Sequence, residues 1–513
     1  MALAGLNFGW QRLQAPLPMW HARVDAVQWL AAARTAAAEG GRLLALWGSD
    51  RGRAGLAVSA AYAATKGLYW VNLPLDDGRT HYPDLSQLFA FASRMQRAAA
   101  DLAGVVAEGA QDRRGWLQHG AWPQDYRPLQ AGAASQPVSR QPVEDYPFVR
   151  VEGDGVHEIP VGPVHAGIIE PGHFRFSVVG EKVLRLEQRL GYTHKGVEQR
   201  FTQMPALDAY KLAGRVAGDS TVAFAWAYCM ALESALGVAI PQRAHWLRAL
   251  LLERERVANH LGDLGALGND AGLAFGLSQF SRLREDWLRL SREAFGHRFT
   301  MDAVAPGGVA ADLDEPMRIR LGQQCAQIEA EARALAGMYE SHAGLQDRFA
   351  TAGVVTPALA AQLGLTGLAA RASGRPGDLR CDQPWAPYER LHVRQAGERS
   401  GDVAARVAVR FDETFESLRL IRDICERLPQ GPVRAGVPQP QAPALGAGWV
   451  EGWRGEVLVA LELGADGAIV RCHCHDPSWQ NWPVLEHAII GNIVPDFPLI
   501  NKSFNLNYSG HDL

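Results

Sequence analysis

The chain has 513 residues, too many for one hydrophobic core, so its length predicts two or three domains. Hydrophobic residues make up 47% of the chain and charged residues 21%, which excludes a disordered or fibrous protein. The net charge is −4 and the sequence has no basic block, so neither nucleic acid nor an anionic membrane surface is expected as a direct partner. Six scattered cysteines argue against a disulfide framework and favour a reducing, cytoplasmic compartment.

The N-terminal part of the chain alternates between helical and strand patterns. One amphipathic helical pattern that ends at glycine is followed by three strand patterns, and these segments are residues 24–41, 42–50, 55–64 and 68–77. They predict a small α/β domain over residues 1–130. Proline, alanine, serine and glutamine then dominate without an apolar period, which predicts a linker over residues 131–148.

The pattern changes at residue 149. Residues 149–190 alternate like short antiparallel strands joined by turns that contain glycine, proline and histidine. Long helical patterns follow over residues 206–236, 240–265, 277–296, 312–342, 356–372 and 400–428. Near the C-terminus, residues 455–463 and 468–475 flank a "GADG" turn and predict a β-hairpin. We therefore predict a second, mainly α-helical domain over residues 149–513, with short antiparallel β elements at its start and near its C-terminus. The predicted fold class is α+β.

One apolar stretch, residues 221–240, has the length that crosses a bilayer. It carries Glu233, is rich in alanine and has polar residues on both sides, so a buried helix is the better interpretation. The N-terminal residues lack the charged and apolar regions of a signal peptide. No glycine-rich phosphate loop follows a predicted strand, so the sequence does not support a nucleotide site.

The segment "RCHCHDPSWQNWP", residues 471–483, suggests a metal site at first sight. Strand residues alternate between faces, however, so Cys472 and Cys474 share one face while His473 and His475 share the other. A Cys-x-Cys pair supplies two ligands, whereas a closed tetrahedral site needs four, and no companion motif occurs elsewhere in the chain. The four side chains together are therefore not expected to hold one ion.

Several longer motifs carry a family resemblance. They are "VGPVHAGIIEPGHFRFSV", "LGYTHKGVEQR", "LDAYKLAGRVAGDS", "LLLERERVANHLGDLGALGNDAGL", "FGHRFTMDAVAPGGV" and the final segment from "DPSWQNWP" to the C-terminus. In this order they resemble the large subunits of group 4, energy-converting nickel–iron hydrogenases of the formate hydrogenlyase type, and the homologous 49 kDa quinone-site subunit of complex I. The resemblance covers nearly all of residues 150–513. Upstream, "YPDLSQLF" and "WPQDYRPL" resemble the 30 kDa complex I subunit, which the formate hydrogenlyase type fuses ahead of the large subunit.

Hydrogenases of this family hold nickel and iron through four cysteines, in "RxCGxC" and "DPCxxC" motifs. In this chain the four positions hold other residues: Ala217, Ser220, Ser478 and Asn481. Soft thiolate ligands suit a nickel–iron centre, and neither alanine nor neutral serine and asparagine replaces them. The resemblance therefore implies a pocket without its metal. The alternative is a hydrogenase with atypical ligands, for example Cys472 and Cys474 with Asp219.

The complex I resemblance implies a quinone site in the corresponding space. His165 and His173, in "GPVHAGIIEPGHF", and Tyr210, in "LDAY", are the candidates for donating protons to a reduced quinone. The loop is longer than its complex I counterpart, and Tyr210 lies one residue from the family position. The alternative is a histidine that caps a turn and a half-buried structural tyrosine.

The hydrogenase and complex I resemblance also implies roles for further residues. Glu198, in "HKGVE", resembles the acid of a hydrogenase proton gate, although a cap or salt-bridge role is the alternative. Arg215 and Asp219 flank the vacated cysteine positions, and a buried pair between them is expected to fill the site electrostatically. Other residues assigned to the cofactor region are Asp476, in the retained "DP" turn, and His297 and Arg298, expected near a partner's iron–sulfur cluster or as a buried structural pair.

The resemblance implies the large subunit of a membrane-associated oxidoreductase complex, peripheral on the cytoplasmic side of the inner membrane. An iron–sulfur small subunit and antiporter-like membrane subunits are the expected partners. Electrons would pass from the partner's cluster to a quinone-like acceptor, or the redox step would be coupled to ion translocation. Apart from a quinone, no cofactor is expected in this chain. The alternative is a non-redox structural subunit, which Trp479 or another bulky side chain filling the old metal space would favour.

Overall fold

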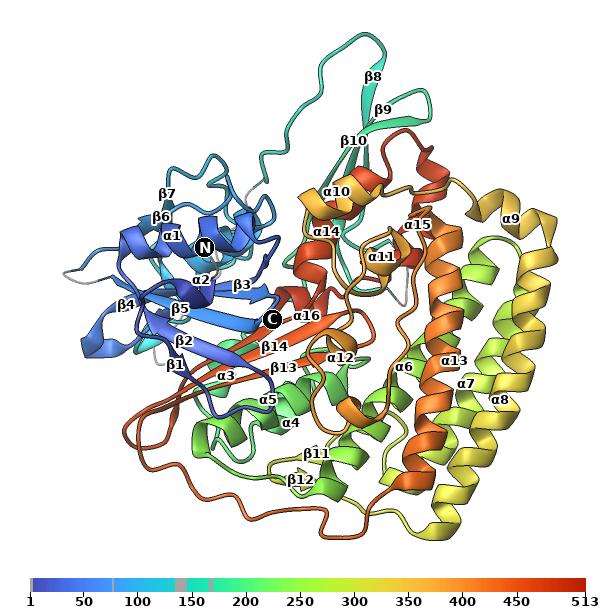
Figure 1. Cartoon of the computed structure of the whole chain (residues 1–513). Helices are drawn as coiled ribbons and strands as arrows, with labels where there is room; N and C mark the ends of the chain where they lie inside the picture. Colours follow the sequence, from blue (N-terminus) through green and yellow to red (C-terminus); the bar gives the residue numbers. More distant parts are fainter. Residues whose placement is uncertain (1–2, 76–77, 134–144, 166–168) are drawn as a thin grey trace.

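The computed structural model describes residues 3–75, 78–133, 145–165 and 169–513, and Figure 1 shows the chain coloured along its length. The predicted linker at 131–148 falls largely on residues 134–144, which lie outside the described residues. The N-terminal region contains a five-stranded sheet in the order β1-β2-β5-β4-β3. Its strands are β1 (Gln11–Arg12), β2 (Met19–Arg23), β3 (Arg42–Asp50), β4 (Leu56–Ala64) and β5 (Gly67–Leu75).

Two helices and a small parallel pair of strands complete this region. Helix α1 (Ala26–Ala38) begins at a capping box in which Asp25 and Gln28 exchange side-chain and backbone hydrogen bonds. Helix α2 (Ala92–Ala103) ends at left-handed Gly104, and β6 (His81–Pro83) pairs with β7 (Val106–Glu108). The predicted helix and three strands of the N-terminal region are therefore confirmed.

The second region starts with an antiparallel sheet of β8 (Val156–Val161), β9 (His173–Val179) and β10 (Lys182–Arg189). Two short helices follow, α3 (Val197–Phe201) and α4 (Tyr210–Ala213). The long helices α6 (Gln242–Asp270), α7 (Ala274–Phe295), α8 (Glu315–Ser341) and α13 (Val403–Arg427) then pack side by side (Figure 1). Helix α8 begins at Asp314, whose side chain accepts from the Met317 amide, and it has a proline in its first turn.

Shorter elements connect and flank these helices. They are β11 (Val304–Ala305), β12 (Gly308–Val309), α9 (Ala343–Phe349), α10 (Pro357–Gln362), α11 (Gly367–Ala372) and α12 (Leu379–Asp382). The single helix predicted over 356–372 is therefore two helices separated by a turn. The mixed helix and strand architecture, with small antiparallel sheets near the C-terminus, confirms the α+β class.

Helix α5 (Thr221–Leu236) is the apolar stretch that has the length of a bilayer span. It is buried almost throughout, and its Glu233 pairs with buried Arg248 at 2.6 Å. Strand β13 (Ala444–Glu451) crosses the helix so closely that a Cβ at Gly446 or Gly448 would lie 1.9 or 1.8 Å from a carbonyl oxygen of α5. Only glycine permits this approach. Among the described residues, no helix is both long enough and apolar enough to span a membrane.

The C-terminal segment forms the sheet that supports the candidate site. Strands β14 (Glu456–Leu463) and β15 (Ile469–His475) make the predicted hairpin and pair with β13 in the order β13-β14-β15. Three helices close the chain: α14 (Ser478–Ala488), α15 (Phe497–Phe504) and α16 (Ser509–Asp512).

The N-terminal sheet lies against this C-terminal hairpin, which places the blue and red ends of the chain together in Figure 1. Arg42 and Arg51 of the first region form ion pairs with Glu456 and Glu462 of β14, at 2.6 and 2.7 Å. The ring of Trp47 stacks on that of His473, with 4.6 Å between centroids. Strand β3 and β14–β15 thus form a seam between the two regions.

Candidate functional site

The loop "RVAGDS" joins α4 to α5 and carries two of the four vacated positions. The helix predicted over 206–236 is therefore interrupted, because residues 214–220 form a turn and α5 starts only after Ser220. The other two positions lie on α14, directly after β15. There the buried Asp476 carboxylate accepts the Ser478 amide at 2.8 Å and so holds the "DP" turn in shape.

An arginine from the C-terminal sheet fills the space between these two loops. Arg454 donates through Nη2 and Nη1 to the two carboxylate oxygens of Asp219, at 2.5 and 2.8 Å, and its Nη1 lies 3.3 Å from Ser220 Oγ. Burial opposes the ionisation of Asp219, but the Arg454 guanidinium outweighs it and lowers the pKa of this carboxyl. Asp219 is thus held as a carboxylate within an ion pair.

Arg215 does not make the predicted pair with Asp219. It lies half-exposed and pairs with Asp302 instead, at 2.7 and 2.9 Å. Arg215 is in the exposed turn between α4 and α5, whereas Asp219 points toward the C-terminal sheet. The predicted Arg215–Asp219 pair is therefore not formed; Asp219 is partly exposed, and its partner is the buried Arg454.

The remaining vacated positions are held by ordinary hydrogen bonds. Ser478 Oγ accepts the Asn507 amide at 2.9 Å, and the Asn481 side chain both accepts from and donates to the Thr366 backbone, at 3.1 and 3.2 Å. Ala217 offers no ligand at all. Because neutral oxygen and amide groups already in hydrogen bonds replace the thiolates, these four positions do not fit a nickel–iron centre.

The two cysteines of β15 point away from this space. His473 and His475 contact Glu198 and Gln480, whereas Cys472 and Cys474 face α5 near Tyr228. Across the part of the chain that the structure describes, no group of three or more His, Cys, Asp and Glu side chains is arranged to hold a metal ion. The expected alternation of faces along the strand is therefore observed.

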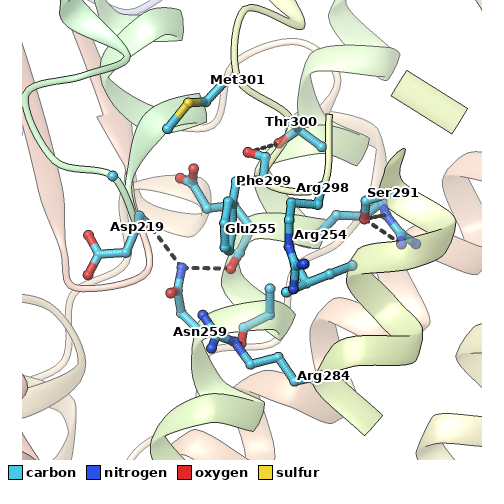
Figure 2. Close-up of a pocket in the computed structure, with 13 residues that line it drawn as sticks. Asp219, Arg254, Glu255, Asn259, Arg284, Ser291, Arg298, Phe299, Thr300 and Met301 are labelled. Carbon is cyan, nitrogen blue, oxygen red and sulfur yellow. Dashed lines mark hydrogen bonds between the residues drawn. The ribbon is translucent and has the colours of Figure 1, made fainter. Parts of the chain in front are cut away.

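A cavity of about 310 Å³ opens beside the vacated loop (Figure 2). Its wall is formed by that loop, by α6 and α7, and by the turn that follows α7. The lining residues are Gly218, Asp219, Arg254, Glu255, Ala258, Asn259, Arg284, Leu288, Ser291, Arg298, Phe299, Thr300 and Met301. This volume is at the lower end of the range found for small-molecule sites, so the cavity suits a small ligand.

Glu255 is the titratable group at the centre of the cavity wall. Its carboxylate oxygens accept the Val222 and Ala223 amides at 2.6 and 3.2 Å, at the N-terminus of α5. Burial raises the pKa of Glu255 to about 8, although the two amides favour the charged form. The side chain therefore carries a proton at neutral pH and faces a ligand-sized space.

The cavity also contains Arg298, and His297 lies close to it. The His297 ring accepts the Phe299 and Met301 amides at 3.2 and 3.4 Å and so shapes the turn after α7. Exposed Arg298 pairs with Glu285 at 2.6 Å. Of the residues assigned by resemblance to the cofactor region, Asp219 and Arg298 line the cavity, His297 orders its edge, and Asp476 supports the neighbouring turn.

None of the proposed quinone ligands lines this cavity, and the two histidines lie together beside Gly162. The half-buried His165 ring lies 5.5 Å from the Phe174 ring, and His173 Nδ1 is 3.2 Å from the Gly162 carbonyl. Tyr210 begins α4 and is half-buried near Asp302. Among the described residues, no hydrogen bond or ring contact joins either histidine to Tyr210.

Glu198 lies in the seam between the two regions. It is buried, and it accepts hydrogen bonds from Arg471 at 3.0 Å and His473 at 2.7 Å. Burial opposes its ionisation, but Arg471 and His473 outweigh burial and lower the pKa of Glu198 to about 2. The geometry is that of a buried carboxylate that two hydrogen-bond donors hold ionised at neutral pH.

Glu198→Gln is expected to lower the free energy of unfolding by about 1.5–3 kcal/mol at neutral pH, because it removes charge from two buried hydrogen bonds. The native pKa lies below the unfolded value, so this stability is present above about pH 4.5 and is lost as the pH falls toward 2. Urea titrations at several pH values measure it, with exposed Glu293→Gln as the control. A deficit that changes between pH 6 and 8 would instead indicate a carboxyl that exchanges protons in that range.

Comparison with known proteins places this geometry in a family. A model of the 49 kDa subunit of respiratory-chain NADH dehydrogenase matches residues 270–446, and one of the 30 kDa subunit matches residues 22–136. Formate hydrogenlyase subunit 5 of Escherichia coli (strain K12) is 31% identical over 92% of this chain and 85% of its own length. The chain belongs to this family. It is a member of the large subunits that membrane-bound hydrogenases share with complex I, and it carries a fused 30 kDa-type region.

Other relatives agree with this family assignment. Hydrogenase-4 component G of the same strain is 31% identical over 85% of this chain and 77% of its own length. The structure of the membrane-bound sulfane sulfur reductase, an archaeal respiratory membrane complex, matches with a TM-score of 0.66 at 24% identity, over 70% of this chain and 99% of that chain. The latter shows the shared fold. This family member is thus a large subunit of a hydrogenase-like or complex I-like membrane assembly, with membrane subunits as partners.

Sequence reasoning missed the residues that define the cavity. Arg454 lies in the segment "VEGWRGEVLV", residues 450–459, where no sequence signal indicates that it reaches Asp219. Arg254, Glu255 and Arg284 appeared as ordinary helix charges. A stripe of charges within a helix that is otherwise buried was the available signal, because buried charges are rare unless a partner or a site accounts for them.

Proposed function

We propose that this chain is the electron-transferring large subunit of its complex and that it works without a nickel–iron centre. Electrons from an iron–sulfur cluster of a partner small subunit would reduce a small acceptor bound in the cavity beside the vacated loop. The observation that carries this proposal is the cavity itself, which adjoins the old metal positions although those positions are filled. Antiporter-like membrane subunits and a cytoplasmic orientation complete the proposed assembly.

The chemistry required of this chain is modest. A two-electron reduction of the acceptor consumes two electrons from the partner's cluster and two protons. Glu255 faces the cavity as a protonated carboxyl near neutral pH, and a general acid works best when its pKa lies near the operating pH. It would deliver one proton and recover it from solvent through the open side of the cavity, and the second proton would come from solvent by the same route.

A quinone-like acceptor is one form of this proposal. His165, His173 and Tyr210 would then act as proton donors at a second position, and their variants would lower electron flow without preventing assembly. Because neither histidine contacts Tyr210 among the described residues, the structure favours the cavity near Glu255 over this position. Coupling of the redox step to ion translocation would be the task of the membrane partners.

A structural role is the second candidate, and a specific observation supports it. The Arg454–Asp219 pair and the hydrogen bonds of Ser478 and Asn481 stabilise the former metal space as protein interior. Trp479, the expected filler, packs instead on His511, with 4.0 Å between ring centroids. A scaffold would need the filled positions but would not need the cavity.

The purified complex is expected to contain iron and no stoichiometric nickel, and to transfer electrons to an added acceptor. Glu255→Gln should slow this transfer by about 100-fold, since general acids contribute that much or more. Exposed Glu340→Gln is the control. Nickel at one equivalent per complex would overturn the proposal. If the complex needs this chain to assemble but transfers no electrons to the acceptor, the structural role would be favoured.

A further inference from the structure

The cavity wall contains a buried arginine, Arg254, that forms no ion pair with a carboxylate of the described residues. Arg254 is 1% exposed and stacks on Trp287, with its guanidinium 3.8 Å from the ring centroid. Its Nε and Nη2 donate to neutral acceptors, which are the Ser291 hydroxyl, the Trp287 carbonyl and the Gln324 side chain. Its buried Nη1 has no hydrogen-bond partner among the described residues. Burial lowers the pKa of this guanidinium to about 10, so it is still charged at neutral pH.

A second arginine on the same wall is also without a counter-charge. Arg284 lies half-buried on α7, and its Nε donates to the Ala258 carbonyl at 3.1 Å. No carboxylate lies within salt-bridge distance of Arg284 in the described part of the chain, and its two Nη groups remain available. Figure 2 shows Arg254, Arg284 and Arg298 together around the cavity.

The acidic residues of the cavity do not offset this charge. Asp219 is committed to Arg454, and Glu285, outside the lining, is committed to Arg298. Glu255 faces the same space, but burial raises its pKa to about 8, so its carboxyl is mainly uncharged at neutral pH. The two uncompensated guanidinium groups therefore give the cavity an excess of positive charge, which is costly inside a protein unless an anion balances it.

We propose that this cavity binds a small oxygen-bearing anion, an oxoanion or a carboxylate, at the Nη groups of Arg284, with the enclosed positive charge of Arg254 behind the same wall adding to the attraction. Guanidinium groups match the geometry of such anions with paired N–H donors. The Glu255 carboxyl and the Thr300 hydroxyl line the same wall and offer further hydrogen bonds. The acceptor of the proposed function would accordingly be an anion. That role of the ligand rests on the proposed function, whereas binding of the anion does not.

Sulfate and acetate are suitable probes, added to the assembled complex and to the full-length chain at constant ionic strength set with chloride. Calorimetric titration should give saturable binding of at least one probe. Arg284→Gln should weaken it by about 10- to 100-fold, as expected for the loss of a charged hydrogen bond. Arg254→Gln should do the same. Exposed Arg282→Gln, on the same helix but outside the cavity, is the matched control.

The outcomes separate this inference from the proposed function. Equal binding in wild type and Arg284→Gln, or binding to the isolated chain that disappears in the complex, would overturn the anion site, whatever happens to Arg254→Gln. No binding of either probe while electron transfer persists would also overturn it and leave the proposed function standing. Lost binding in Arg284→Gln with unchanged electron transfer would support the anion site and place acceptor reduction elsewhere.

Discussion

Arg380→Leu is expected to lower the free energy of unfolding by about 3–5 kcal/mol, because it leaves buried carboxylates without their partner. Arg380 is 2% exposed and donates to both oxygens of Glu253, at 3.0 and 2.9 Å, and to Asp378 at 2.7 Å. Glu253 is fully buried and also accepts the hydroxyls of Tyr388 and Ser417, at 2.7 Å each. Two buried carboxylates would therefore lose their nearest counter-charge at once, and Arg256, 3.5 Å from Glu253, would be left to compensate only in part.

Urea unfolding of the full chain, followed by tryptophan fluorescence, measures this effect. Arg320→Leu is the control, because Arg320 is half-exposed and pairs with half-exposed Glu293, a contact expected to contribute at most about 1 kcal/mol. If Arg380→Leu cost no more than the control, water or protons would have to reach Glu253 and Asp378, and the cluster would not be the sealed network that the structure shows.

For Glu255→Gln we compare the free energy of unfolding of the variant with that of wild type. The difference, variant minus wild type, is expected to be several kcal/mol more positive at alkaline pH than at pH 5. Burial raises the pKa of Glu255 from 4.5 to about 8. Between these values the folded chain keeps a proton that the unfolded chain has lost, so wild-type stability falls as the pH rises and levels off above about pH 8. A shift of this size corresponds to about 5 kcal/mol. Glutamine does not titrate and so removes this dependence.

The measurement is the difference in unfolding free energy between variant and wild type at pH 5 and at pH 9. Other buried acids titrate in both proteins, and Glu451, whose pKa is raised to about 7, is one of them, so the difference is the informative quantity. Glu340→Gln should run parallel to wild type. A constant difference for Glu255→Gln would mean that the amides of Val222 and Ala223, with the dipole of α5, keep this carboxyl ionised.

Local sequence signals predicted the strands and most helices well. The hairpin at 455–475 was predicted because apolar residues flank a glycine-containing turn, and its strands end within a residue of the expected limits. The helix over 206–236 was predicted as continuous because apolar residues continue through "KLAGRVAGDS" at helical spacing. The chain turns there because tertiary contacts decide its path, namely Arg454 with Asp219 and the Glu255 carboxyl at the first amides of α5.

In the candidate site, too, the sequence predicted what depends on local motifs and missed what depends on tertiary contacts. The vacated positions were identifiable because motif spacing is a local property of the sequence. The pairing of Asp219 with Arg454 joins residues 235 positions apart, and no local pattern selects Arg454 over Arg215. The cavity likewise depends on how α6 and α7 pack, which leaves Arg254 and Arg284 without an acidic partner in the described part of the chain although the sequence around them is rich in both charges.

The seam between the N-terminal sheet and the C-terminal hairpin has a consequence for how the gene could be arranged. Arg42 and Arg51 bind β14, Arg471 of β15 donates to the Gly48 carbonyl of β3, and Trp47 stacks on His473. These contacts are side-chain and backbone interactions that do not depend on the peptide bonds between the two regions. Two polypeptides encoded separately, one ending and the other starting in the intervening segment, would thus meet across the same surface that the single chain uses.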